Sequence, residues 1–274
     1  MAKTVIFINH KGGVAKTTSV VNVAVALSKK TKKQILVIDA DPQGNASLVL
    51  GTVSPYDQTK TLRDLFLDPA ATLSTVAQPS KYDRVDLIPS NIMVSGLAVN
   101  LPTNDPRRFI ALVQKMDPAA RKKYAYILID CPPSIDSIFV TNALIACDYY
   151  VIPIEAESSF ALAGVEDMLS AIKTMTTGTN TNIKLLGVLL TMFDSRTIAS
   201  KVVADATRSF FGRENVFATV IPRNAATSRA NVMKMSIFEL DAKASGAQAY
   251  LELAKEIVGR IDAREKHHDQ KERS

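Results

Sequence analysis

A short glycine-containing loop between an apolar run and a helical pattern constrains this chain more than any other segment. Residues 11–18, Lys-Gly-Gly-Val-Ala-Lys-Thr-Thr, follow the apolar run Val5–Ile8 and lead into a segment whose apolar residues recur at helical spacing. The first N–H groups of such a helix have no partner within it, and with the helix dipole they form an anion site. Lys16 would reach the β- and γ-phosphates of a nucleotide, and the Thr17 hydroxyl would bind a magnesium ion. The loop therefore predicts a nucleotide-binding protein.

The loop departs from the common phosphate-loop pattern G-x-x-x-x-G-K-[ST] at two positions. The two glycines of that pattern fall on His10 and Ala15, and a second lysine, Lys11, lies five residues before Lys16. The alternative interpretation is a Gly-Gly turn that binds nothing. Acidic motifs farther along the chain favour the phosphate-binding interpretation.

The order of the remaining segments predicts a doubly wound α/β domain. Short β-branched runs alternate with amphipathic segments, which is typical of a mostly parallel sheet with helices on both faces. The expected strands are Thr4–Asn9, Ile35–Ala40, Val85–Pro89, Tyr126–Asp130, Tyr149–Ile154, Leu185–Thr191 and Val216–Ile221. The expected helices are Thr17–Lys30, Pro106–Met116, Ser137–Ala146, Leu162–Met175, Ile198–Phe211 and Ser245–Ile261. We expect a single domain over residues 1–262 and a polar, disordered tail over residues 263–274.

Composition and charge narrow the class of protein. The chain has 274 residues, of which 47% are hydrophobic, so it can bury one large core. No apolar run reaches the ~18 residues of a membrane span. Cys131 and Cys147 lack metal-type spacing, so we expect free thiols in the cytoplasm. The segment Thr191–Met235 carries seven bases and three acids, and Pro106–Lys123 carries six bases and one acid. Basic segments of this kind are typical of surfaces that bind an anionic polymer, and they are equally typical of helix faces exposed to solvent.

Acidic residues follow two of the expected strands. Asp39 and Asp41 come after Ile35–Ile38, and Asp130 comes after Tyr126–Ile129. The carboxyl ends of parallel strands meet at one edge of the sheet, where ligands bind. A carboxylate there can hold magnesium through a water molecule or orient a nucleophile, although aspartate is also a common turn residue. Because another strand end carries the phosphate loop, this edge is predicted to hold magnesium and nucleotide.

Together these motifs resemble those of the ParA/Soj partition ATPases, P-loop NTPases of the ParA/MinD superfamily with a deviant Walker A loop. The matching stretches are KGGVAKTT at 11–18, DADPQGNAS at 39–47, IPSN at 88–91, YILIDCPPS at 126–134, LLTMFDSRT at 189–197, VIPRN at 220–224 and SGAQAYLELAKE at 245–256. The resemblance implies that ATP with Mg²⁺ drives a face-to-face homodimer that binds DNA without sequence preference. A ParB-type centromere-binding protein would stimulate the weak basal ATPase and release the dimer during plasmid or chromosome segregation.

The resemblance also assigns roles to individual residues. It implies that Lys11 reaches the phosphates of the partner subunit in the dimer, and that Asp41 positions the attacking water. The implied magnesium residues are Thr17, Asp41 and Asp130, and the implied catalytic residues are Lys11, Lys16 and Asp41. The implied nucleotide-binding residues are Lys11, Gly12, Gly13, Val14, Ala15, Lys16, Thr17, Thr18, Met192, Pro222, Arg223 and Asn224, the last four near the adenine. The candidates for DNA binding are Arg196, Arg223 and Arg229, which lie beside those last stretches.

Two positions depart from the family pattern. Ala15 stands where glycine is commoner, and its Cβ makes a positive φ costly, so nucleotide affinity could differ. The second arginine that relatives carry after Pro-Arg-Asn falls on Ala226 here. Either Arg229 replaces that arginine or DNA binding relies more on Arg196, and both interpretations stay open.

Other classes of ATPase are weighed by what they require. A MinD-type membrane ATPase needs an amphipathic C-terminal helix with bulky apolar residues, whereas residues 266–274 are polar. We therefore expect no membrane partner and a cytoplasmic, nucleoid-associated protein. A binding module without hydrolysis is disfavoured because Asp41 and Asp130 are both present. The alternative that stays open is a ParA-like ATPase that positions a protein cargo over the nucleoid.

Overall fold

Seven strands form one sheet with the phosphate-loop strand inside it. The computed structural model describes residues 1–97, 105–158, 160–180 and 182–272. In it the strand order is β3-β4-β2-β5-β1-β6-β7. The strands are β1 (Lys3–Phe7), β2 (Gln34–Asp39), β3 (Gln78–Pro79), β4 (Val85–Ile88), β5 (Tyr124–Asp130), β6 (Tyr149–Glu155) and β7 (Lys184–Thr191). All pairs are parallel except β3 with β4. The doubly wound α/β prediction is confirmed.

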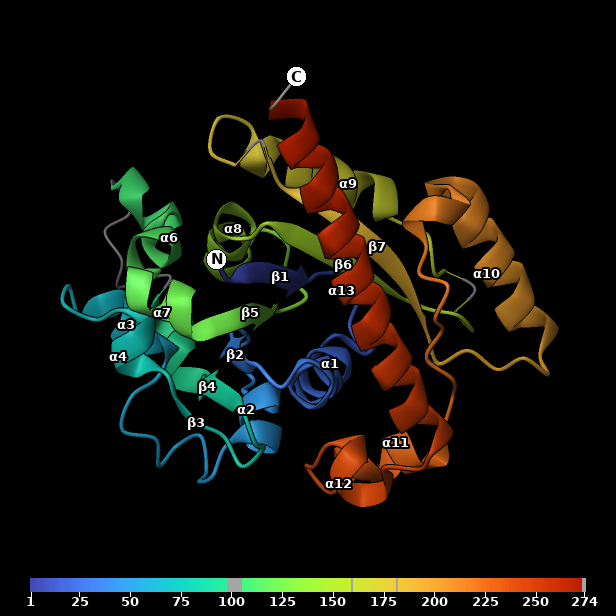
Figure 1. Ribbon diagram of the computed structural model, residues 1–274, viewed down its shortest axis with the longest axis horizontal. Coiled ribbons are helices and arrows are strands. Elements are labelled where there is room, and N and C mark those ends of the chain that lie inside the picture. Colours follow the sequence, from blue (N-terminus) through green and yellow to red (C-terminus); the bar gives the residue numbers. More distant parts are fainter. Residues whose placement is uncertain (98–104, 159, 181, 273–274) are drawn as a thin grey trace.

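Helices cover both faces of this sheet (Figure 1). One face packs against α1 (Lys16–Thr31), α2 (Asn45–Leu50), α11 (Ala225–Val232), α12 (Ile237–Asp241) and α13 (Ser245–Glu272). The other packs against α3 (Leu62–Leu67), α4 (Leu73–Val76), α6 (Ala111–Lys115), α7 (Pro118–Lys123), α8 (Ile138–Ala146), α9 (Val165–Thr176) and α10 (Ile198–Phe211). Short 3-10 turns occupy Ile92–Gly96, Pro106–Phe109 and Arg213–Asn215.

The alternation of side chains along each strand explains the two cores. Val5 and Phe7 of β1 belong to the core on the α1 side, whereas Ile6 and Ile8 belong to the opposite core. All four are buried, because a strand covered on both faces must be apolar at successive positions. This burial allows β1 to be an inner strand, so the phosphate loop that follows it starts within the sheet.

The run Val216–Ile221, predicted as a strand, is not one. It follows β7 through backbone bonds from Phe217 to Val188 and from Ile221 to Leu190, but makes only isolated bridges. The amides between these contacts, Ala218 N and Thr219 N, donate instead to the carboxylate of Glu256 on α13, at 2.9 and 3.0 Å. A side chain thus takes the donors that a regular ladder would use.

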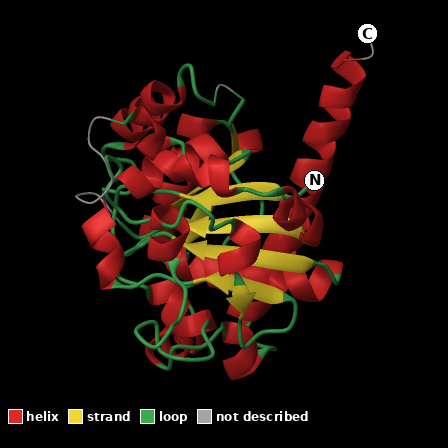
Figure 2. Cartoon of the chain, turned by 90° about the vertical axis from the view of Figure 1, so that its left-hand side faces the viewer, coloured by secondary structure: helices red, strands yellow, loops and turns green. Residues whose placement is uncertain are grey.

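The C-terminal helix is longer than the sequence predicts. The polar segment 263–274 is expected to be disordered, but α13 continues to Glu272 and its last turns stand clear of the domain (Figure 2). Good helix formers (Ala, Arg, Glu, Lys and Gln) make up most of that extension and allow the helix to propagate. The expected helix Pro106–Met116 is split into a 3-10 turn and α6. No helix in the described ranges has the length and apolar content needed to cross a membrane.

Arg260 on α13 fastens this helix to the sheet. Its guanidinium donates to the carbonyls of Leu186 (3.1 Å), Glu214 (3.1 Å) and Val216 (2.7 Å), and pairs with Glu256 at 2.9 Å. Arg260→Ala should lower the free energy of unfolding by about 2–4 kcal/mol, because the carbonyls of the buried Leu186 and Val216 lose a charged donor. Urea denaturation measures the change.

Lys255→Ala is the matched control for Arg260, since Lys255 lies on the same helix and, among the described residues, pairs only with the exposed Glu252. Its effect should stay within about 0.5 kcal/mol. Equal losses in the two variants would contradict the anchoring role of Arg260.

Candidate functional site

The loop between β1 and α1 has the backbone that an anion site requires. Gly13 has a φ of 78° and Ala15 has a φ of 65°, so both residues are left-handed. Ala15 is the N-cap of α1, which has neither a side-chain cap nor an acidic residue in its first turn. A Cβ at Gly12 or Gly13 would meet no heavy atom of the described chain within 4 Å. The loop is therefore open on the side from which a phosphate would approach.

Contacts from neighbouring strands hold the loop in place. The hydroxyl of Thr191, at the end of β7, contacts the carbonyls of Val14 (3.2 Å) and Ile154 (3.1 Å). Lys16 is buried, and its Nζ donates to the carbonyl of Lys11 at 2.7 Å. Burial lowers the pKa of Lys16, and the carboxylate of Asp130 acts in the opposite direction. The ammonium group of Lys16 thus lies between the loop and the acidic strand ends.

Lys11 lies against its own subunit. Its backbone N–H donates to Asn9 Oδ1 at 3.0 Å, while its buried Nζ has no hydrogen-bond partner in the described part of the chain. Lys11 lines a cavity of about 290 Å³ with Glu155 and the exposed Phe160. An unpaired buried cation is costly unless an anion approaches it. This supports a phosphate role for Lys11, and its reach across a dimer stays a prediction.

The turn after β2 is held by hydrogen bonds to Asp39. Asp39 Oδ2 accepts from the backbone N–H (2.8 Å) and the hydroxyl (2.6 Å) of Ser47, and the Ser47 hydroxyl accepts from Ser90 N. Gly44 passes so close to Ser90 that a Cβ would lie 2.6 Å from its carbonyl oxygen. The stretches at 39–47 and 88–91 therefore form one structure. It orients Asp41, whose Oδ1 accepts from Gln43 N at 2.9 Å.

Two buried carboxyls face each other at the ends of β2 and β5. Asp39 pairs with Asp130 in the parallel register, and both are fully buried. Burial raises the pKa of Asp39 to about 7, and burial together with the Asp39 carboxyl raises the pKa of Asp130 well above its usual range. The sequence assigns no role to Asp39, although its place two residues before Asp41 was a usable signal. Asp39 shapes the site through its neighbours.

The carboxyl of Asp130 fits a magnesium site. Neither of its two buried oxygens accepts a hydrogen bond of normal geometry among the residues that the structure describes, although the Thr17 hydroxyl lies near enough to act against the rise of its pKa. Orphaned buried acceptors are unfavourable unless a cation or a water molecule satisfies them. No group of three His, Cys, Asp or Glu residues in the described ranges could hold a metal. Mg²⁺ takes few protein ligands and binds largely through phosphates and water, so the single buried carboxyl of Asp130 suits it.

The two stretches assigned to the adenine lie side by side. Phe193, next to Met192, bridges to Pro222, and the N–H of Arg223 donates to the carbonyl of Phe193 at 3.0 Å. Met192 itself has a φ of 53°. Asn224 caps α11 by accepting from Ala226 N at 2.7 Å. The structure thus brings these stretches together, and their contact with adenine stays a prediction.

Two of the three arginines assigned to DNA are engaged in ion pairs. Arg196 binds both oxygens of Asp194 and holds the pKa of that carboxyl well below its usual range. Arg223 pairs with Glu157, in the loop after β6. Arg229 is exposed and has no ion pair within the described residues. Arg229 is therefore the most available of the three.

Position 226 differs from position 229 in its surroundings. Ala226 is buried against the core on the α13 side, whereas Arg229 lies three residues later on α11 and is exposed. Residues three apart are neighbours on a helix surface, so Arg229 could serve the region of position 226. That replacement stays a prediction.

Known proteins resemble this chain along nearly its whole length. The AAA domain family matches residues 2–185. The sporulation initiation inhibitor protein Soj of Bacillus subtilis is 36% identical over 258 residues, 94% of this chain and 99% of that protein. The chromosome-partitioning ATPase Soj of Treponema pallidum is 38% identical over 260 residues, 95% of this chain and 98% of that protein. The crystal structure of cobyrinic acid a,c-diamide synthase from Mycobacterium smegmatis, with a bound ATP analog and magnesium, superimposes with a TM-score of 0.78, at 30% identity and 93% coverage of each chain.

Burial of Asp39 should make stability depend on pH. Its pKa is about 7 in the fold and 3.8 in its ordinary state, so between these values the folded chain binds an extra proton. The stability contributed by this proton is complete below about pH 4 and is lost as the pH rises through about 7. Asp39→Asn should reduce this loss, and the buried Asp130, whose pKa is also raised, should account for what remains. Urea denaturation at about pH 5 and about pH 7.5 measures the difference between variant and wild type.

Asp57→Asn, at an exposed position, is the matched control for Asp39→Asn and should keep the wild-type dependence on pH. Carboxyls whose pKa is lowered in the fold, such as Asp117 and Glu256, make the stability of the fold rise with pH. They do so in the wild type and in both variants. They therefore cancel in the comparison. If Asp39→Asn kept the same change in stability between the two pH values, the buried proton would be excluded.

Proposed function

The chain belongs to the Soj/ParA family of partitioning ATPases, and from this premise we propose that it is a DNA partition switch driven by ATP binding and hydrolysis. The ATP form would be a homodimer with both nucleotides between the subunits, and it would bind DNA without regard to sequence. A ParB-type partner would stimulate hydrolysis and release the dimer from the nucleoid. One observation carries the proposal: the uncapped start of α1 and the buried Lys16 lie beside a carboxyl, Asp130, that has no partner among the described residues.

The residues of the site suit phosphoryl transfer to water. The first N–H groups of α1 and the ammonium of Lys16 would bind the phosphates and offset the charge that develops on them. Thr17 and Asp130 would hold Mg²⁺, with Asp41 in support, and this ion supplies further positive charge at the phosphates. Asp41 would orient the attacking water, because Gln43 N fixes one of its oxygens at the strand end.

Hydrolysis by the isolated chain should be slow. The phosphate loop contains no arginine, and its extra cation is Lys11, whose reach across the dimer requires assembly. A supplied arginine accelerates related reactions by about 10³ to 10⁵. A basic segment of the partner, acting together with DNA, would supply the missing stabilisation.

The names of the relatives favour DNA as the cargo. The Treponema pallidum relative is called a chromosome-partitioning ATPase, and it matches more of this chain at higher identity than the synthase does. The segment Thr191–Met235 carries seven bases and three acids and contains the two stretches assigned to the adenine. Dimerisation would bring two such segments together and double the number of DNA phosphates neutralised. A ParA-like ATPase that positions a protein cargo would use the same chemistry with another partner.

Substitutions in the site should separate binding from hydrolysis. Asp41→Ala keeps the phosphate loop and removes the group that orients water, so it should accumulate as an ATP-bound dimer with a strongly reduced rate of phosphate release. Lys16→Ala should stay monomeric with any nucleotide. Lys11→Ala should bind ATP and dimerise poorly. Size-exclusion chromatography with light scattering and a phosphate-release assay measure these outcomes. Hydrolysis by Asp41→Ala at the wild-type rate would refute the role given to Asp41.

The ion pairs of the arginines should modulate DNA binding. Glu157→Gln frees Arg223 and should tighten binding of random-sequence duplex in the presence of ATP, by a few-fold (roughly 0.5–1 kcal/mol). Arg229→Ala should weaken binding. It should also make the slope of the logarithm of the binding constant against the logarithm of the salt concentration shallower by about 0.9 for each DNA phosphate that Arg229 neutralises. Arg196→Glu should abolish binding and leave the ATP-driven dimer intact. Mobility-shift titrations at several salt concentrations measure all three.

Glu166→Gln is the matched control for Glu157→Gln, because it removes the same charge from an exposed position on α9. It should change DNA affinity less than Glu157→Gln does. Equal DNA affinity with ATP, with ADP and without nucleotide would refute the switch itself.

A further inference from the structure

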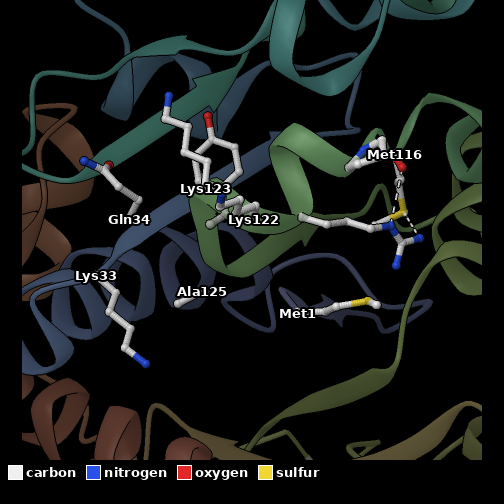
Figure 3. A pocket seen from close by; sticks show the side chains of 10 residues that line it. Met1, Lys33, Gln34, Met116, Lys122, Lys123 and Ala125 are labelled. Carbon is white, nitrogen blue, oxygen red and sulfur yellow. Dashed lines mark hydrogen bonds between the residues drawn. The ribbon is translucent and has the colours of Figure 1, made fainter.

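The surface outside the nucleotide site combines exposed charge with exposed apolar side chains. A cavity of about 780 Å³ opens where β2 and β5 begin, and Figure 3 shows Lys33, Lys122 and Lys123 among the side chains that line it. These lysines are exposed, and exposed lysines are solvated by water and select no particular ligand. An exposed apolar stripe is different, because the free energy falls when a partner removes it from water. Helix α10 carries such a stripe.

Helix α10 lies at the periphery of the domain, beyond the edge strand β7 (Figure 1). Its inner face packs on the domain through Ala204 and Thr207, which are buried. On its outer face Ile198 is 79% exposed, Val202 60% and Phe210 41%. The outer face of a helix on a globular domain is ordinarily polar or charged. That of α10 is instead an apolar surface that no described part of the chain covers.

The apolar side chains form one ridge along the helix. The ridge consists of Ile198, Val202, Ala206 and Phe210, at intervals of four residues, and is about 18 Å long. Its two end residues are large and its two middle residues are smaller, so it presents a similar shape from either end. If a second copy of α10 lies antiparallel on the ridge, Ile198 of one chain meets Phe210 of the other. Val202 then meets Ala206, whose small side chain allows the two helices to approach closely.

Two charged residues lie beside the ridge. Lys201 and Asp205 are exposed and four residues apart, so they lie on the same side of the helix. A two-fold axis reverses the direction of the second helix and keeps this side facing its counterpart, so Lys201 of each chain would face Asp205 of the other. Asp205 also pairs with Arg208 of its own helix at 3.3 Å, but its side chain stays 73% exposed and has room for a second donor. The charges therefore complement those of an antiparallel copy.

We propose that the outer face of α10 binds α10 of a second copy of this chain, antiparallel, about a two-fold axis between Val202 and Ala206. The ridge and its flanking charges are both self-complementary, which favours a second copy over an unrelated helix. Duplex DNA is disfavoured because apolar side chains do not neutralise phosphates. A lipid surface is disfavoured because Asp205 lies beside the ridge and the opposite face of α10 is buried in the domain.

The contact should be weak. Two helices of 14 residues cover less than the roughly 1,200 Å² of a stable interface, so a dissociation constant of about 0.1–1 mM is expected. At the micromolar concentrations of size-exclusion chromatography this contact stays empty, so Lys16→Ala is still expected to be monomeric there.

Together with the ATP-driven homodimer the contact would link several dimers, a consequence that rests on the proposed function. Each homodimer would present two α10 faces, and two different two-fold contacts in one chain generate an open row. Neighbouring dimers on one DNA molecule would meet at a high effective concentration, at which a weak contact is occupied.

The test measures self-association of the full chain without nucleotide, by sedimentation equilibrium between about 10 μM and about 1 mM. Lys16→Ala is measured beside the wild type, because it removes the phosphate lysine and with it the ATP-driven contact. Both proteins should form dimers at the highest concentrations. Val202→Glu places a charge at the centre of the contact and should raise the dissociation constant about tenfold or more. Val232→Glu, the same substitution at a valine of α11 that is 82% exposed, is the matched control and should leave it unchanged.

Reciprocal charge variants test the antiparallel orientation. Lys201→Glu and Asp205→Lys should each raise the dissociation constant about three- to tenfold, because like charges then face each other. Mixed in equal amounts, the two variants should form a heterodimer of wild-type strength, since opposite charges again face each other on both sides of the axis. Sedimentation of one fluorescently labelled variant with the other unlabelled measures this.

The proposal is overturned if the wild type stays monomeric over the whole range, if Val202→Glu and Val232→Glu act equally, or if the two charge variants do not complement each other. Binding of the monomeric wild type, but not of Val202→Glu, to phosphatidylglycerol vesicles would assign the ridge to a lipid surface and equally overturn it.

Failure of this contact and failure of the proposed function are distinguishable. If Lys16→Ala dimerises at high concentration through the ridge, but the wild type neither hydrolyses ATP nor binds DNA, then only the partition function fails. If the wild type forms the ATP-driven dimer, but shows no association without nucleotide that Val202→Glu weakens, then only the α10 contact fails.

Discussion

The left-handed backbone at Ala15 is the constraint on which the nucleotide site depends. A residue with a Cβ pays about 1–2 kcal/mol for this conformation, so the surrounding structure must impose it. The buried strand β1 on one side and the long, well-packed helix α1 on the other fix both ends of the loop. Thr191 ties the loop to β6 and β7. The two cores therefore hold the start of α1 open to an anion.

The second constraint is electrostatic. Parallel pairing of β2 and β5 forces Asp39 and Asp130 into one buried space, where two like charges are unfavourable together. Asp39 is satisfied by Ser47 and the turn, which leaves Asp130 as the carboxyl without a partner in the described chain. A cation near Asp130 would therefore offset the cost of burying this carboxyl without a hydrogen-bond partner. Binding of magnesium and nucleotide would stabilise the fold at the point where it is least satisfied.

The sequence predicts the parts of this molecule that local patterns determine. Apolar runs locate the six long strands to within a few residues, and the helix Ile198–Phe211 is predicted with the bounds that it has. It does not predict that Glu256 takes the amides of Ala218 and Thr219, because that contact joins residues far apart in the chain. The pairing of Arg223 with Glu157 was missed for the same reason. The phosphate loop was predictable because adjacent residues form it, whereas the surroundings of the arginines and of Asp39 depend on the assembled sheet.

The two edges of a doubly wound sheet differ in the ligands that they favour. At the carboxyl edge the helix N-terminus supplies N–H donors, and the roles proposed for Asp41 and Asp130 would make magnesium a companion of the phosphates. At the amino edge helices end, so backbone dipoles disfavour anions and side-chain cations must more than offset them. The carboxyl edge thus favours a nucleotide by its backbone geometry, whereas the amino edge lacks the helix N-termini that would bind phosphate.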